Sequence, residues 1–208
     1  MPAEDAGEWV RPRVAGLVLA AGAGRRYGMP KALVPYEGSL LVERAYRLVA
    51  AFCDPVFVVL GAAAEEIASR ADLGNAVVLH NADWDTGMGS SLRTGLAALT
   101  ALPDELRGPE AVDAVLVHLV DLPGITAAAI RRVASYTAPD VLAVATYDGV
   151  RGHPVLLGHA HWAGAAESAT GDQGARDYLA AHEVTEVECA DVADPTDLDY
   201  PRGTHPHP

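Results

Sequence analysis

Short apolar runs alternate with alanine-rich segments of helical period along most of the chain. The runs are rich in Val and Leu and lack the polar alternation of a half-exposed strand, so we expect strands that are buried on both faces. Strand–helix alternation predicts right-handed crossovers around a parallel sheet, and therefore a three-layer α/β fold. The predicted strands are 14–20, 56–60, 76–80, 113–120 and 141–146, and the predicted helices are 40–51, 62–71, 90–102 and 125–136.

The alternation of apolar runs and helical segments changes near Gly149. There "DGVRGHPVLLG" is typical of a strand bounded by turn residues, "TGDQGARDYLAAH" opens a helix, and "VTEVEC" has the alternation of a late strand. We therefore expect a small antiparallel insertion in a Rossmann-like, mostly parallel sheet. A single domain is expected over residues 14–202, with flexible polar ends at 1–13 and 203–208.

Charge and composition exclude several classes of partner. The formal net charge is −13, with 28 acidic against 15 basic residues, so the chain as a whole repels nucleic acid and acidic membrane surfaces. Cys53 and Cys189 stand in no zinc or disulfide spacing. The N-terminus is acidic where a signal peptide is basic, and no apolar stretch approaches the roughly 18 residues of a membrane span. We expect a cytoplasmic protein with no nucleic-acid or membrane partner.

The segment "AAGAGRRYGMPK" after the first run combines three glycines with three cations. Glycines allow a ligand to approach the backbone closely, and the cations Arg25, Arg26 and Lys31 suit a small polyanion such as a triphosphate. A dinucleotide loop needs no such cations, its G-x-G-x-x-G spacing is one residue shorter, and the second run ends without an acidic residue for a ribose. A solvated basic turn is the structural alternative.

Carboxylates follow the later strands, at the edge where an open parallel sheet binds its ligands. Asp121 ends the fourth run in "HLVDLPG", and "DPTDLDYP" supplies Asp194, Asp197 and Asp199. Separated carboxylates can hold a hard divalent cation whose shell is completed by substrate phosphates. A helix cap at Asp121 and an acidic terminal loop are the structural alternatives. Beside the cations, these are the parts that nucleotidyl transfer requires.

The motifs carry a family resemblance. "LVLAAGAGRRYGMPKAL" resembles the L-A-A-G-x-G-x-R-x-G-x-x-K signature of nucleotidyltransferases, and the chain resembles their MobA-like branch over residues 14–201, nearest the molybdenum-cofactor cytidylyltransferases. The other similar segments, in family order, are "HNADWDTGMGSSLRTGL", "VDLPGI", "GHPVLLG", "TGDQGAR" and "DLDYP". Tyr27, Tyr200 and the "PRG" that follows depart from the family pattern, and these departures concern the acceptor more than the nucleotide.

The resemblance implies a nucleotide-diphospho-sugar-transferase-like fold and a Mg²⁺-dependent enzyme. It would move CMP from CTP onto a small phosphorylated acceptor such as molybdopterin cofactor, release pyrophosphate, and pass the product to a cofactor-receiving enzyme. Implied catalytic residues are Arg25, Lys31 and Asp121, and implied metal ligands are Asp121 with Asp199 or Asp197. The implied nucleotide-binding residues are Leu19, Ala20, Ala21, Gly22, Gly24, Arg25, Lys31, Gly87, Met88, Ser90 and Ser91, and the implied acceptor-binding residues are His153, Pro154, Asp172, Gly174 and Arg176.

Other functions stay open at this point. "AAG" at 20–22 resembles the cytidine-using members, whereas guanosine-using relatives tend to have a "GG" pair. Within the transferases, the acceptor could instead be a sugar phosphate, phosphocholine or another small phosphate. Outside them, a nicotinamide- or flavin-dependent oxidoreductase and a non-catalytic nucleotide-binding cofactor chaperone remain alternatives.

Overall fold

The computed structural model describes residues 13–102 and 112–199, which form a seven-stranded sheet in the order β5-β4-β1-β6-β8-β7-β9. Strand β8 runs antiparallel to β6 and β7, and the other pairs are parallel. The predicted mixed sheet is therefore confirmed. The strand bounds are β1 Arg13–Ala20, β4 Val56–Leu60, β5 Val77–His80, β6 Val112–Leu119, β7 Leu142–Tyr147, β8 Val150–Gly158 and β9 Thr185–Glu188, and a hairpin joins β2 Pro35–Tyr36 to β3 Ser39–Leu40.

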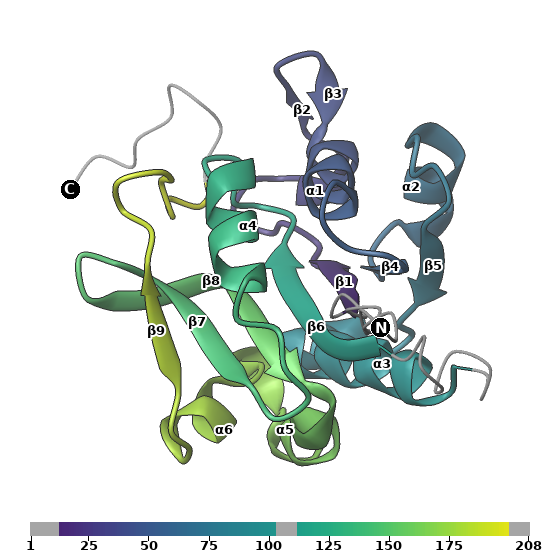
Figure 1. Ribbon diagram of the computed structural model, residues 1–208. Helices are drawn as coiled ribbons and strands as arrows, with labels where there is room; N and C mark the ends of the chain where they lie inside the picture. The colour runs from purple at the N-terminus through teal and green to yellow at the C-terminus, as the bar shows by residue number, and fades with distance from the viewer. Residues whose placement is uncertain (1–12, 103–111, 200–208) are drawn as a thin grey trace, which may run out of the picture.

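Helices cover both faces of the sheet, which gives the three expected layers (Figure 1). On one face lie α1 Leu41–Ala50, α2 Ala64–Arg70 and α4 Ala127–Ala134. On the other lie α3 Met88–Thr100, α5 Trp162–Ser168 and α6 Arg176–Ala180. The short 3₁₀ helices are η1 Lys31–Leu33, η2 Trp84–Thr86, η4 His159–His161 and η5 Gly171–Gln173.

Alternating residues of β1 supply two separate cores. Val18 packs with the α1 and α4 layer, whereas Leu17 packs with the α3 and α5 layer. Because side chains of a strand point to opposite faces in turn, a wholly apolar run is needed to serve both cores. Helix α3 comes close to this strand because Gly95 has no side chain: a Cβ there would lie 2.5 Å from Leu17 Cδ1.

Two predictions about individual elements differ from the structure. Strand β5 is apolar but lies at the edge of the sheet, and Val77 and Val78 are 42% and 44% exposed, so the expected two-sided burial is wrong there. An apolar run alone does not distinguish a central strand from an edge strand. Helix α3 begins at Met88, ahead of the predicted Ser90, because Gly87 has a φ of 112° that ends the preceding turn.

The predicted flexible ends lie outside the described residues, apart from Arg13, which begins β1. Most of the 101–111 loop also lies outside them. Within the described ranges, no helix is both long and apolar enough to cross a bilayer.

His118 is a buried polar residue on β6, beside Val18 of β1. Its Nδ1 has no hydrogen-bond partner among the described residues. Burial, with a smaller contribution from nearby His153, lowers the pKa of His118 to about 3. The imidazole is therefore neutral in the folded protein at neutral pH.

Acidification should destabilise the fold through His118. Below pH 6.5 the unfolded chain binds a proton at this residue, whereas the folded chain does not until about pH 3. His118 therefore costs no stability above pH 6.5, and the unfolding free energy falls as the pH drops from 6.5 to about 3. We expect His118→Phe to reduce the pH dependence of the unfolding free energy by about 1.4 kcal/mol per pH unit in this window. Urea unfolding at pH 6.5 and 4.5 measures it, and an unchanged slope would contradict the assignment.

Candidate active site

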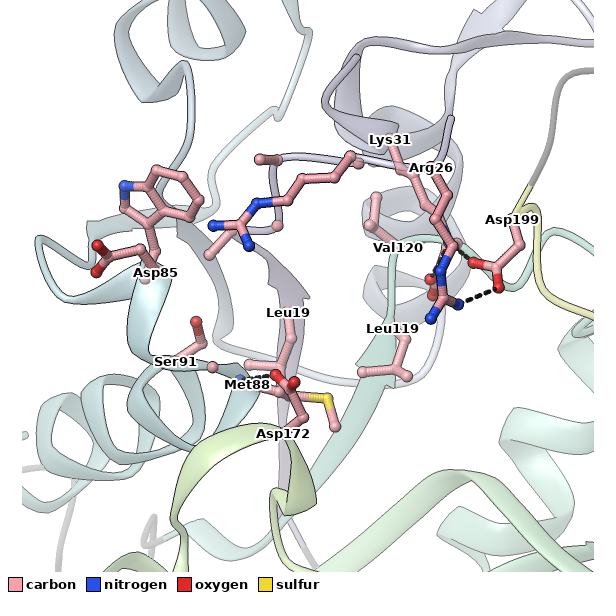
Figure 2. A pocket seen from close by; sticks show the side chains of 18 residues that line it. Leu19, Arg26, Lys31, Asp85, Met88, Ser91, Leu119, Val120, Asp172 and Asp199 are labelled. Atoms are coloured by element: carbon pink, nitrogen blue, oxygen red, sulfur yellow. Dashed lines mark hydrogen bonds and ion pairs between the residues drawn. The ribbon is translucent and has the colours of Figure 1, made fainter. Parts of the chain in front are cut away.

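A cavity of about 390 Å³ opens at the carboxyl end of β1 and β6 (Figure 2). Its walls come from the loop after β1, the helix η2, the first turn of α3 and the residues that follow β6. We call it the first cavity. The predicted site residues that line it are Leu19, Ala21, Gly22, Gly24, Arg25, Lys31, Gly87, Met88, Ser91, Asp121, Asp172 and Asp199.

The glycine loop after β1 lines the first cavity. Gly24 has a φ of +60°, and a Cβ there would lie 1.9 Å from the carbonyl oxygen of Met29, so only glycine fits this turn. Gly22 has no atom within 4 Å of the place where its Cβ would be. The open space beside Gly22 leaves room for a ligand to approach the main chain.

The strongest polar contacts of the cavity converge on Lys31. Its Nζ donates to Asp121 Oδ2 at 2.9 Å and to Asp199 Oδ1 at 2.8 Å, and Arg26 also donates to Asp199, at 3.0 Å. Figure 2 shows Lys31, Arg26 and Asp199 together at one end of the cavity, with Asp85 at the opposite end. The charged end can therefore receive phosphates while the other end receives the rest of a ligand.

Partial burial and charge pairing set the protonation of this cluster. Burial by itself lowers the pKa of Lys31, but the hydrogen bond to Asp199 and the charge of Asp121 raise it above its ordinary value. The hydrogen bond from Lys31 lowers the pKa of Asp199. Burial together with the charge of Asp199 raises the pKa of Asp197. At neutral pH, Lys31 and Asp199 are both charged.

Backbone contacts bring the two distant carboxylates together. The N–H of Leu198 donates to the Asp121 carbonyl at 3.0 Å, and the N–H of Asp194 donates to the Gly124 carbonyl at 3.2 Å. Arg44 of α1 holds the same loop, because its guanidinium donates to the Pro123 carbonyl at 2.9 and 3.2 Å. The segment that carries Asp199 is thus fastened beside the end of β6.

The carboxylates fit a hard divalent cation as a two-ligand site. Asp121 and Asp199 each place an oxygen within 2.9 Å of a single ammonium nitrogen, so two anionic oxygens face one point. Mg²⁺ is commonly held by one or two carboxylates, with waters and substrate phosphates as its other ligands. Among residues 13–102 and 112–199, no group of three or more His, Cys, Asp or Glu side chains is placed to hold a metal by itself.

A second cavity, also of about 390 Å³, shares Leu19 and Met88 with the first. Valines and leucines of the sheet, with one leucine each from α3 and α6, form the apolar part of its wall, and Arg151, His153, Gly174 and Arg176 also line it. Arg151 is already paired with Glu186 at 2.8 Å. Among the residues that the structure describes, the guanidinium of Arg176 donates only to the neutral amide of Gln173, at 3.3 Å. Arg176 is thus the better placed cation for an anionic ligand.

His153 presents a neutral ring to the second cavity. Burial lowers its pKa, although its hydrogen bond to the Val117 carbonyl has the opposite effect. Because a carbonyl only accepts, Nδ1 carries the proton of this 3.3 Å bond, which leaves a lone pair on Nε2.

Four predicted site residues lie outside both cavity walls. Ala20 is in the core of β1 and Pro154 is buried in β8, whereas Ser90 is hydrogen-bonded beneath the first turn of α3 and Asp197 lies near Asp199. The residues of the first cavity wall that the family motifs did not predict are Ala23, Arg26, Trp84, Asp85, Leu119 and Val120. In the second cavity, Arg151 and most of the apolar wall were also not predicted. Arg26 had a signal as one of the three loop cations, and Trp84 and Asp85 lie within a quoted motif.

Comparisons with known proteins identify the family of this chain. The MobA-like NTP transferase domain matches residues 16–187. Nicotine blue oxidoreductase of Paenarthrobacter nicotinovorans is 35% identical over 199 residues, which cover 90% of this chain and 93% of that protein. Molybdenum cofactor cytidylyltransferase of Escherichia coli is 26% identical over 142 residues, covering 68% of each chain.

A solved structure extends the likeness to three dimensions. The crystal structure of Rv0371C from Mycobacterium tuberculosis in complex with manganese has a TM-score of 0.71 and 25% identity, and the match covers 90% of this chain and 92% of that one. The domain match spans the glycine loop, Lys31 and Asp121. The chain belongs to the MobA-like NTP transferase family and is a nucleotidyltransferase.

Proposed function

We propose that this protein transfers CMP from CTP to a phosphorylated acceptor of the molybdopterin type, with release of pyrophosphate. The observation that carries the proposal is the meeting of Lys31, Asp121 and Asp199 at one end of the first cavity. Cations for a triphosphate and carboxylates for Mg²⁺ are the two requirements of nucleotidyl transfer, and here they lie side by side.

The chain's own residues account for most of the chemistry. The backbone after β1 would cradle the nucleotide, and Arg25 and Lys31 would neutralise the triphosphate. An oxygen of the acceptor phosphate attacks the α-phosphorus in line, a new P–O bond forms, and the bond to the β-phosphate oxygen breaks as pyrophosphate leaves. Asp121 and Asp199 would hold Mg²⁺, which when bound supplies charge neutralisation at the α-phosphate. Positioning and charge then provide the rate without a covalent enzyme intermediate.

The second cavity supports a largely apolar, anionic acceptor. It adjoins the first through Leu19 and Met88, so an acceptor bound there would face the nucleotide. The faces of a flat ring could pack against Val144, Val155 and Leu157, while the polar edge of the ring could meet His153 and Gln173. With Arg176 available to an anionic group, this wall supports a pterin-type acceptor.

Removing the Arg176 charge should weaken acceptor binding selectively. We expect Arg176→Gln to raise the KM for the acceptor about tenfold, since one charge-assisted hydrogen bond is lost, while the KM for CTP changes little. Steady-state kinetics with each substrate varied in turn measures the two KM values separately. Arg131→Gln, an exposed arginine on the α4 layer, is the matched control. Equal changes in both KM values would argue against an acceptor site in the second cavity.

The function is tested by a panel of nucleoside triphosphates with and without a molybdopterin-type acceptor, with pyrophosphate release as the readout. We expect release that needs Mg²⁺ and the acceptor, with CTP preferred over GTP by roughly 10²-fold in kcat/KM. Preference for GTP would refute the cytidylyl assignment within the family. Nucleotide binding without any pyrophosphate release would favour the chaperone alternative.

A second candidate, an oxidoreductase, rests on the 35% identity to nicotine blue oxidoreductase. The apolar second cavity could hold a flat dye. Against a dinucleotide site, β4 ends at Leu60 and continues into Gly61 and Ala62, with no carboxylate there for a ribose. NADH- or NADPH-dependent bleaching of nicotine blue, measured by absorbance, would establish this activity, and thermal shifts with NADPH against CTP plus Mg²⁺ separate the two candidates.

A further inference from the structure

Asn81, directly after β5, is a buried amide whose orientation is fixed. It is 4% exposed, and its Oδ1 accepts from the backbone N–H of Asp83 at 3.0 Å. Its Nδ2 donates to Ser90 Oγ at 2.7 Å and to Ser91 Oγ at 3.0 Å. A flipped amide would point its NH₂ group at the Asp83 N–H, so only one orientation satisfies all three contacts.

The Asn81 amide therefore donates both of its hydrogens to the two serine hydroxyls. Each hydroxyl accepts one hydrogen bond and has its own hydrogen left to donate elsewhere. Ser90 has acceptors for that hydrogen in the carbonyls of Gly87, at 2.8 Å, and Asp83, at 3.0 Å.

Ser91 differs from its neighbour in what surrounds its hydroxyl. In the described part of the chain its hydroxyl hydrogen meets no acceptor, and Ser91 lines the first cavity. Figure 2 shows Ser91 on the side of that cavity opposite Lys31 and Asp199. The Ser91 hydroxyl is thus held as a donor that faces ligand space.

We propose that Asn81 is a positioning residue that fixes Ser91 as a hydrogen-bond donor, so that Ser91 binds a lone pair of the nucleotide's base or ribose. This inference rests on the proposed nucleotide site. Without Asn81, the hydroxyl could rotate and would present either a hydrogen or a lone pair. With Asn81, a ligand group that can only donate is rejected at this position, because two donors would face each other.

A double-mutant cycle on the full chain tests the coupling, with the dissociation constant for CTP measured by isothermal titration calorimetry. Asn81→Asp keeps the shape of the side chain and reverses the direction of its hydrogen bond with Ser91. The carboxylate accepts the Ser91 hydroxyl hydrogen, which then points away from the ligand. We expect Asn81→Asp and Ser91→Ala each to weaken CTP binding about tenfold, and the double variant to be no weaker than Ser91→Ala. Thr94→Ala, in the same helix but outside both cavities, controls for loss of a hydroxyl.

Stability is followed in parallel, because a buried carboxylate can unfold the protein. If Asn81→Asp does not fold, Asn81→Ala replaces it. We again expect the double variant with Ser91→Ala to bind CTP no more weakly than Ser91→Ala alone. Additive losses, or CTP affinity unchanged in either Asn81 variant, would overturn the proposal while leaving the transferase function intact. Wild-type protein that binds no nucleoside triphosphate would overturn both.

The source of the lone pair is identified by repeating the Ser91→Ala comparison with 2′-deoxy-CTP. If the ribose 2′-oxygen is the acceptor, the tenfold penalty of Ser91→Ala disappears with the deoxynucleotide. If the base or another ribose oxygen is the acceptor, the penalty persists. Each result supports a donor at Ser91, and a penalty absent with both nucleotides contradicts it.

Discussion

Asp121→Asn is expected to lower the rate of pyrophosphate release by about 10²- to 10³-fold, the usual cost of removing one preorganised charge contact at the reacting phosphate. The asparagine keeps the shape of the side chain but removes the anion that would hold Mg²⁺. It also removes one of the two carboxylates that contact Lys31, while Asp199 remains in place. Folding should change little, because Lys31 keeps its ion pair with Asp199 and the asparagine fills the same space.

Steady-state kinetics over a range of Mg²⁺ concentrations, with a melting curve of each variant, measures this loss. Asp191→Asn is the matched control: it removes a carboxylate ion-paired to Arg132, at 2.6 Å, outside both cavities, and should leave the rate unchanged. Normal turnover in Asp121→Asn would mean that the Asp121 carboxylate takes no part in the reaction and only stabilises the loop that follows β6.

The sheet could be predicted from the sequence because its central strands need apolar residues on both faces. Leu17 and Val18 show why: neighbouring positions serve different cores, so polar alternation is excluded. The same reasoning failed for Val77 and Val78, since strand composition does not record which strand lies at the edge.

The candidate site could be named in part, but its internal contacts could not be predicted. Lys31, Asp121 and Asp199 each followed from a motif, yet motif spacing does not say that one ammonium lies between the two carboxylates. That contact depends on the backbone bond from Leu198 to Asp121, which joins segments far apart in the chain. Asn81 was missed for a similar reason, because its role depends on how β5 meets the first turn of α3.

Lys31→Met should have two opposite effects. Turnover should fall about 10²- to 10³-fold, because the charge that would neutralise the triphosphate is gone. The affinity of the free protein for a divalent ion should rise, because the ammonium of Lys31 lies between the two oxygens that such an ion would use, 2.9 and 2.8 Å from them. Two cations cannot share this position, so the ion must displace Lys31 before both carboxylates can bind it.

Mn²⁺ is a suitable probe, since it can be titrated calorimetrically without nucleotide. We expect at least about tenfold tighter Mn²⁺ binding in Lys31→Met than in wild type, equivalent to about 1.4 kcal/mol. Arg26→Met is the informative comparison: Arg26 also pairs with Asp199, but its side chain is 71% exposed, and solvent screens its charge, so the gain should be smaller.

In wild type, a bound triphosphate offers Lys31 a competing anion. A non-hydrolysable CTP analogue should therefore raise the affinity for Mn²⁺, and by reciprocity Mn²⁺ should raise the affinity for the analogue by the same factor. Part of this coupling arises because the triphosphate draws Lys31 away from Asp121 and Asp199. In Lys31→Met that part should be lost, since no ammonium occupies the two carboxylates. Equal or weaker Mn²⁺ binding in Lys31→Met would mean that the ammonium helps to assemble the carboxylates and does not compete with the metal for them.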